Sequence, residues 1–257
     1  MRARAIALAG AGVLATWACL WGVAPFADHL VRGASPIVAE AGFGAIVFGT
    51  ILVLAWGLGR VAGVSWRWAG FSRGAAIGLG ALLLAIGYCA LAGTLTTGAG
   101  STVSLALPLG ALVILLQVVA EEAMFRGVVQ PLLVRGVGAG AAVPLTAASF
   151  AALHGVLGGL EPVMLANMLL GGVLFGLLAL TRGVGAAIGA HFAWNAFEQL
   201  GVGLDPNPGH GAFGAMIDLD LRGAPLWGGS VAGLNGSIAM GIAVVVAILF
   251  VLWRRPA

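Results

Sequence analysis

The sequence predicts an all-α fold, a polytopic transmembrane helical bundle with about eight spanning helices. Apolar residues make up 61% of the 257 residues and charged residues only 8%, which leaves too few polar side chains to cover a surface exposed to water. The 43 glycines and 10 prolines lie inside apolar stretches, as they do in membrane helices. Because no polar block is long enough to fold separately, we expect residues 1–257 to form a single membrane domain.

A membrane-spanning helix needs about 20 apolar residues. The first candidate follows the basic start Met1–Arg4, but no small-residue cleavage site comes after it, so we expect a retained helix and not a signal peptide. The candidate spans are residues 6–23, 42–59, 75–93, 105–129, 143–157, 162–180, 184–200 and 237–253.

Arginines mark the connections between these spans, and the chain has no lysine. If the N-terminus is cytoplasmic, only Arg32 and Arg222 fall in connections on the opposite side of the membrane. This bias predicts an even number of spans with both termini in the cytoplasm. The positive charges form no continuous stripe, so nucleic-acid binding has no support. The arginines on the cytoplasmic side are Arg2, Arg4, Arg60, Arg67, Arg73, Arg135, Arg182, Arg254 and Arg255.

The long polar connection, residues 201–236, is expected to be an extracytoplasmic loop or a short cap. It contains Asp205, His210, Asp218 and Asp220, which are residue types that bind metal ions. A glycine-rich loop holds ligands poorly in place, and solvated loop residues explain these side chains equally well.

Charged residues inside a span are the informative ones, because each costs roughly 2.5–3.5 kcal/mol on the insertion scale unless it finds a partner. The fourth span contains Glu121, Glu122 and Arg126. Glu122 and Arg126 are four residues apart, with the acid first, which favours an ion pair on one helical face. Glu121 is rotated by about 100° from Glu122 on the helix. Its carboxylate is therefore left for another partner and is a candidate base.

The predicted span 143–157 carries His154. The predicted span 184–200 carries His191 and, one turn later, Asn195. A rise of about 1.5 Å per residue places these groups and Glu121 at a similar depth in the bilayer. A carboxylate beside an imidazole can deprotonate a water molecule, while a second histidine and an amide can donate hydrogen bonds to an oxyanion. We therefore expect residues 105–200 to contain a hydrolytic site.

Other polar and small residues in the spans have simpler interpretations. Gln117 and Asn167 could reach the same site, but single amides in spans usually bond a neighbouring helix. Glycines at four-residue spacing, Gly172 with Gly176 and Gly185 with Gly189, predict close contacts between helix backbones.

Three motifs in this region resemble the CAAX-protease and bacteriocin-processing (CPBP) family of intramembrane peptidases. In the order of that family they are Glu121-Glu122 with Arg126, Phe150 with His154, and His191 with Asn195. The resemblance implies an intramembrane endopeptidase that hydrolyses a peptide bond of a membrane-associated peptide or protein, in a prokaryotic plasma membrane. It does not identify the substrate.

The resemblance also implies a role for each matched residue. Glu121 would be the general base and His154 would orient the water, while His191 and Asn195 would form the oxyanion site. The Glu122–Arg126 pair would be structural support. The partners implied are a peptide or membrane-protein substrate and the lipid bilayer.

The CPBP family has been described both as metal-dependent and as metal-free. Glu121, His154 and His191 are residue types that bind zinc, but the chain has no H-E-x-x-H motif and no cysteine near them. We therefore expect no metal and no other cofactor.

Two other kinds of function remain open on the sequence. One is a non-catalytic membrane scaffold or immunity-type protein, and the other is a proton-coupled transporter that uses Glu121 and the histidines as a relay. Serine and aspartyl intramembrane proteases are excluded, because the chain has no G-x-S-x-G motif and no aspartate within a predicted span.

Overall fold

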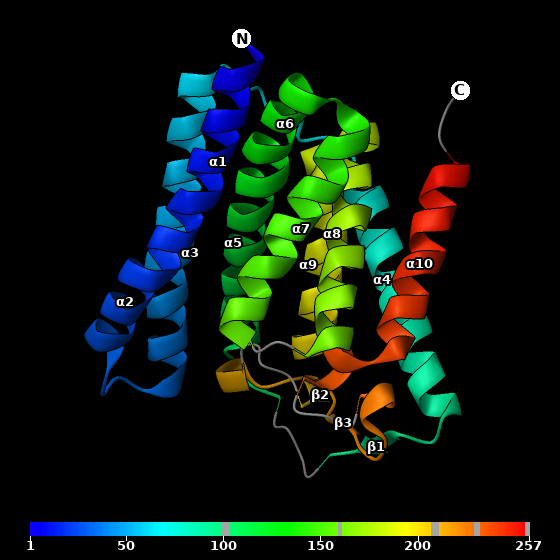
Figure 1. Ribbon diagram of the computed structural model, residues 1–257. Coiled ribbons are helices and arrows are strands. Elements are labelled where there is room, and N and C mark those ends of the chain that lie inside the picture. Colours follow the sequence, from blue (N-terminus) through cyan, green and yellow to red (C-terminus); the bar gives the residue numbers. More distant parts are fainter. Residues whose placement is uncertain (99–102, 159–160, 207–210, 229–231, 255–257) are drawn as a thin grey trace.

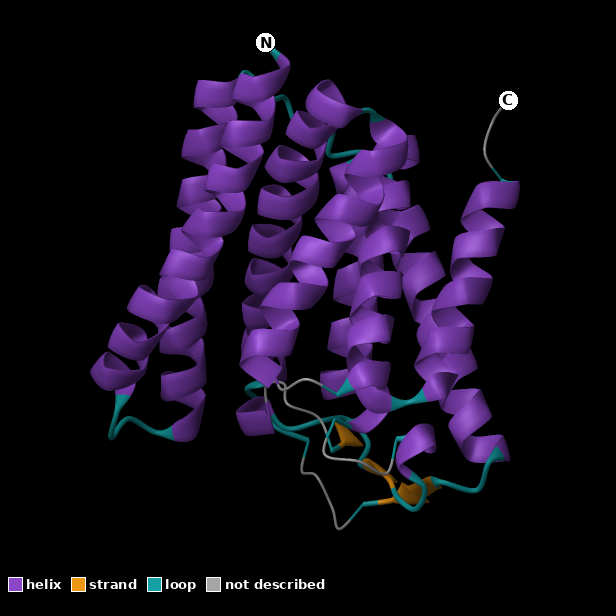
Figure 2. Cartoon of the chain, in the orientation of Figure 1, coloured by secondary structure: helices purple, strands orange, loops and turns teal. Residues whose placement is uncertain are grey.

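The computed structural model describes residues 1–98, 103–158, 161–206, 211–228 and 232–254, and it is a bundle of helices capped at one end by short strands (Figures 1 and 2). This confirms the predicted all-α membrane-type bundle. The helices are α1 (Arg2–Ala18), α2 (Ala24–Val31), α3 (Pro36–Ala62), α4 (Phe71–Leu91), α5 (Leu107–Met124), α6 (Gln130–Val137), α7 (Ala139–Gly158), α8 (Pro162–Arg182), α9 (Val184–Ala196) and α10 (Ile238–Trp253).

Two of the predicted spans are longer than expected because a π-helical turn joins successive helices. The turn Cys19–Val23 joins α1 to α2, and the turn Phe125–Val129 joins α5 to α6. A proline follows each turn, Pro25 and Pro131. Proline has no N–H and its ring clashes with the carbonyl four residues earlier, and the wider π turn accommodates this locally. The helix therefore continues through the proline.

Among the described residues, five helical runs are long and apolar enough to cross a bilayer, while Ile238–Trp253 is apolar but shorter. The predicted count of eight spanning helices is therefore not confirmed. The start of α1 and the end of α10 lie at the same end of the bundle, opposite the strands (Figure 1). The five runs are Arg2–Val31, Pro36–Ala62, Phe71–Leu91, Leu107–Val137 and Pro162–Arg182.

Glycines allow α4 and α9 to touch backbone to backbone. A Cβ atom at Gly78 would lie 2.1 Å from the carbonyl oxygen of Ala190. A Cβ atom at Gly185 or Gly189 would lie 2.1 Å from a backbone carbonyl oxygen within residues 68–71. The packing role predicted for these two glycines is confirmed, since small residues let helix backbones approach in lipid. This contact fixes where α9 lies, and with it the candidate site residues of that helix.

We expect Gly78→Val to destabilise the protein by about 2–3 kcal/mol, because the added side chain must push α9 away from α4. Gly80→Val on the same helix is the matched control. A Cβ atom at Gly80 meets no atom within 4 Å, so this variant should unfold like the wild type. Equilibrium unfolding in detergent micelles measures both, and equal stabilities would contradict the packing role of Gly78.

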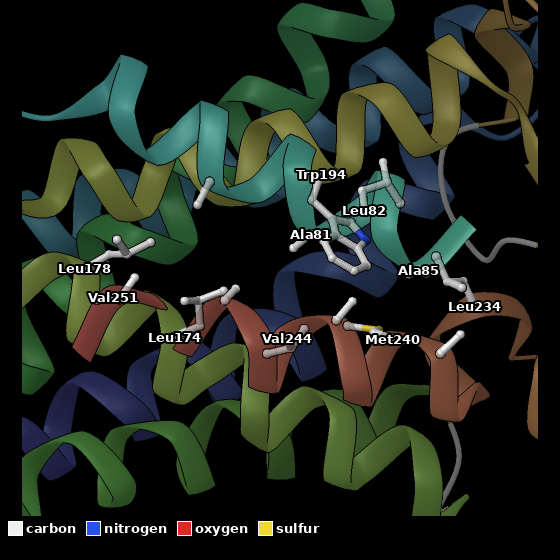
Figure 3. Close-up of a cluster of buried hydrophobic side chains, with 14 of the residues drawn as sticks. Ala81, Leu82, Ala85, Leu174, Leu178, Trp194, Leu234, Met240, Val244 and Val251 are labelled. Atoms are coloured by element: carbon white, nitrogen blue, oxygen red, sulfur yellow. The ribbon is translucent and has the colours of Figure 1, made fainter. Parts of the chain in front are cut away.

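The largest buried apolar cluster joins α4, α8, α9 and α10. Trp194 of α9 lies among the side chains of Leu82 on α4 and Met240 on α10 (Figure 3). Asn167 of α8 adds a polar link, because its amide donates hydrogen bonds to the carbonyl oxygens of Asn235 and Ser237, 2.8 and 2.7 Å away. Asn167 therefore binds the start of α10 and takes no part in the candidate site.

The connection 201–236 forms a cap with a small sheet. Strand β3 (Leu219–Leu221) lies between β1 (Leu95–Thr97), to which it is antiparallel, and β2 (Leu204–Asp205), to which it is parallel. The buried Phe213 packs against Gly110 of α5. The backbone N–H of Ala212 donates to the Glu40 carboxylate of α3 over 3.2 Å. The cap is thus attached to two of the long helices.

Candidate active site

The candidate site lies where α5 passes into the π turn Phe125–Val129. Glu121 and Glu122 stand in the last turn of α5, and Arg126 stands in the π turn itself. The exposed fractions of Glu122 and Arg126 are 0% and 1%. Turns of this kind inside an α-helix occur often at functional sites. Pro131 provides the local reason for this one, because it removes a backbone donor one turn further on.

Glu122 and Arg126 form the ion pair that their spacing predicts, with 3.2 Å between Arg126 Nη1 and Glu122 Oε1. Arg126 Nη2 also donates to the carbonyl oxygen of Gly172 on α8 over 3.3 Å. The guanidinium lies over the ring of Phe150 on α7, 4.4 Å from its centroid. These contacts offset the cost of burying the two charges, and they connect α5 to α7 and α8.

His191 of α9 bonds to Glu122, so the predicted ion pair is in direct contact with a candidate site residue. The distance from His191 Nδ1 to Glu122 Oε1 is 2.9 Å. The ring of Phe175 on α8 stacks on the imidazole with 4.7 Å between centroids and 16° between planes. Phe150 meets the same imidazole edge to face at 6.2 Å. The position and the tilt of this ring are therefore fixed from three helices.

Glu121 points to the other nitrogen of the same ring. Its Oε2 atom lies 4.0 Å from His191 Nε2. That oxygen is buried and has no hydrogen-bond partner among the described residues. The other oxygen, Oε1, accepts a hydrogen bond from Gln117 Nε2 over 3.1 Å. Gln117 thus contacts the candidate base through a hydrogen bond within α5.

His154 contacts Phe150, the residue that also contacts His191. Its Nδ1 atom is 2.9 Å from the Phe150 carbonyl oxygen, and its ring lies 4.3 Å from the Phe150 ring. A carbonyl oxygen only accepts hydrogen bonds, so Nδ1 carries the proton and Nε2 has a free lone pair when the ring is neutral. His154 is half-buried. Its Nε2 atom is therefore suited to accept a proton or a hydrogen bond from water.

Asn195 lies one turn beyond His191 on α9 and is half-buried. Among the contacts of the described residues, it makes no hydrogen bond. The structure thus brings Glu121, Glu122 and His191 into direct proximity. His154 contacts Phe150, whose ring also contacts His191. Asn195 lies on the same helix as His191, and its amide has no hydrogen-bond partner in the described part of the chain.

The sequence did not single out Phe175, which stacks on His191 and also lies 5.6 Å from the Arg126 guanidinium. Nothing in its spacing marks it, because an aromatic residue in an apolar helix is normally a packing residue. The Gly172–Gly176 spacing gave a partial signal. A Cβ atom at Gly172 would lie 2.9 Å from Ala147 of α7, which confirms the predicted close packing. The same glycine supplies the carbonyl oxygen that binds Arg126.

Glu121, His154 and His191 do not bring three ligand atoms within 4.8 Å of one another. Within the described residues, one group of three candidate ligand atoms lies within 4.8 Å of one another, and it consists of Asp205, Asp218 and Asp220 in the cap. No step of the chemistry below is therefore routed through a metal. In the cap, Arg222 pairs with Asp220, and His210 lies outside the described residues.

The comparison with protein families agrees with the three motifs. Residues 103–197 match the family model "type II CAAX prenyl endopeptidase Rce1-like", and this segment contains Glu121, His154, His191 and Asn195. Among curated proteins and among solved structures, no match to the chain is found. Over residues 103–197 this match confirms the resemblance to the CPBP peptidases.

Proposed function

We propose that this protein is an intramembrane endopeptidase that hydrolyses a peptide bond with a water molecule activated by Glu121. The observation that carries the proposal is the buried Glu121 carboxylate. One of its oxygens is held by Gln117, and the other faces His191 Nε2 without a hydrogen-bond partner of its own among the described residues. A carboxylate held in this way is placed to accept a proton from a water molecule.

The reaction uses the groups in order. The oxygen of the water attacks the carbonyl carbon of the scissile bond while Glu121 takes a proton from the water. His154 Nε2 orients this water by accepting a hydrogen bond from it. The carbonyl π electrons move to the oxygen, and the resulting oxyanion receives hydrogen bonds from His191 and the Asn195 amide. When the C–N bond breaks, the leaving nitrogen takes the proton from Glu121. The products are a carboxylic acid and an amine.

We propose a peptide or a membrane protein as the substrate and the lipid bilayer as the surroundings. Two of the helices around the site, α5 and α8, belong to runs that are long and apolar enough to cross a bilayer. A segment that reaches it leaves water, so hydrogen bonds and charges inside the site act in a low dielectric. The proposal requires no metal and no cofactor, since the residues named above supply the base and the oxyanion donors.

The test uses purified protein reconstituted in liposomes together with a membrane-protein fraction from the same kind of cell. Mass spectrometry of peptide N-termini should detect new, specific termini that appear with time and are absent after heat inactivation. If no new termini form while the protein remains folded, the proposal is wrong.

The same liposomes distinguish the proton-coupled transporter. A transporter would carry a solute with a stoichiometric proton flux and release no peptides, whereas the peptidase should release peptides without a sustained proton flux. A protein that does neither and copurifies with a partner would be a scaffold.

A further inference from the structure

Glu122 is placed to control which nitrogen of His191 reaches the reaction. Its Oε1 atom lies 2.9 Å from His191 Nδ1 and 3.2 Å from Arg126 Nη1, and its side chain is fully buried. Glu122 and Arg126 form an ion pair in which the carboxylate is the accepting partner. An ionised carboxylate only accepts hydrogen bonds. The proton between Glu122 and His191 must therefore be bound to Nδ1.

The surroundings hold the ring in this orientation. Phe175 covers one face of the imidazole, and Phe150 contacts it edge to face. Turning the ring over would place a carbon atom against Glu122 Oε1 and break the 2.9 Å hydrogen bond. Breaking it would leave a buried carboxylate with one fewer donor, which is costly in a low dielectric.

We propose that Glu122, held by Arg126, is a positioning residue that keeps the His191 proton on Nδ1 and thereby presents Nε2 to the substrate. This inference rests on the proposed function and assigns it a further residue. Nε2 faces the free oxygen of Glu121 at 4.0 Å, so the ring atom left for chemistry lies beside the proposed base. Among the described residues, the charged groups that contact His191 are Glu121 and Glu122 of α5, and Arg126 pairs with Glu122.

The arrangement has a consequence for the oxyanion site. Because Nδ1–H is bound to Glu122, His191 donates from Nε2 only when the ring carries a second proton. His191 would then act as a charged donor, which makes a stronger hydrogen bond than a neutral one.

The first test is a measurement on the wild-type protein. Protein labelled with ¹⁵N in its histidine side chains, of which the chain has four, is purified in micelles, and the His191 signals are assigned by their loss in His191→Gln. Two-bond ¹⁵N–¹H couplings show which ring nitrogen carries the proton. We expect Nδ1 of His191 to be protonated. An unprotonated Nδ1 beside a protonated Nε2 would overturn the inference, and no activity is needed to see it.

The second test removes the charge of Glu122. In Glu122→Gln we expect the preference for Nδ1–H to be lost and kcat to fall about 10²-fold with little change in KM, the size of effect seen when one oxyanion donor is lost. Unchanged couplings together with unchanged kcat would contradict the role. If this variant does not fold, the wild-type measurement still decides.

The matched control is Gln130→Met. Gln130 is 1% exposed, lies two turns beyond Glu122 and donates to the Gly176 carbonyl oxygen of α8 over 3.0 Å. The variant removes a buried hydrogen bond to α8 without touching His191. It should lose stability and keep the His191 couplings, so a purely structural role for Glu122 would make the two variants alike.

Failure of this inference and failure of the proposed function are distinguishable. If Nδ1 of His191 is unprotonated in a protein that produces new peptide termini, only the positioning role is rejected. A protonated Nδ1 in a protein that cleaves nothing would reject the peptidase and leave the hydrogen bond in place.

Discussion

Glu121→Gln is expected to lower kcat/KM by about 10³-fold, within the 10²–10⁴-fold contribution of a general base. The amide cannot take a proton from water at neutral pH, but it has nearly the same shape as the carboxylate. Its oxygen can still accept the hydrogen bond that Gln117 donates to Glu121 over 3.1 Å. The loss should therefore be chemical and not structural. Cleavage of a fluorogenic peptide by the purified protein in liposomes measures it.

Glu40→Gln is the control for this substitution. Glu40 also lies on a membrane-type helix, and its carboxylate accepts the Ala212 N–H of the cap, away from the histidines. This variant should cleave at a rate within about twofold of the wild type, since a substitution away from the reacting groups has little effect. If Glu121→Gln cleaves as fast as Glu40→Gln, Glu121 is not the base.

Arg126→Met is expected to destabilise the protein by about 3–5 kcal/mol, because removing one partner of a buried ion pair leaves the other charge uncompensated. Methionine fills much of the space of the arginine stem. It leaves the Glu122 carboxylate with His191 as its remaining donor and removes the bond from Arg126 to Gly172. Equilibrium unfolding in micelles measures the loss. The double variant Glu122→Gln/Arg126→Met should recover most of it, because no charge is then left unpaired.

The chain offers a matched control for this change. Asp28 and Arg32 form an ion pair with the same four-residue spacing, but their side chains are 66% and 70% exposed. Arg32→Met should have little measurable effect on stability, since exposed pairs contribute little. If Arg126→Met is as mild as Arg32→Met, the cluster around Glu122 does not depend on the charge of Arg126.

The sequence predicted the membrane-type bundle because apolar runs of spanning length have few other uses. It also predicted the Glu122–Arg126 pair from spacing alone. The angle between Glu121 and Glu122 on the helix showed that they face different ways, but not that His191 lies between them. That contact depends on how α9 packs on α5, which is set by the glycines of the α4–α9 contact and has no signature within the motif.

The strands of the cap could not be predicted from the sequence. Strands of two or three residues, such as Leu204–Asp205 and Leu219–Leu221, are too short to show an alternating pattern. The partner strand Leu95–Thr97 is more than a hundred residues distant in sequence from both, so no local rule pairs them. Phe213 was likewise not recognisable as a buried residue, because it follows a glycine-rich polar stretch.

The glycine contact also bears on how a substrate would enter. A peptide that enters from the lipid has to separate two neighbouring helices. Two helices separate more easily when they contact each other through mobile side chains than through their main chains. At Gly78 and Gly189 the main chains of α4 and α9 touch directly, and separating them would lose the close van der Waals contact that small residues permit between helices. We therefore expect α4 and α9 to stay in contact during turnover and the substrate to enter between a different pair of helices.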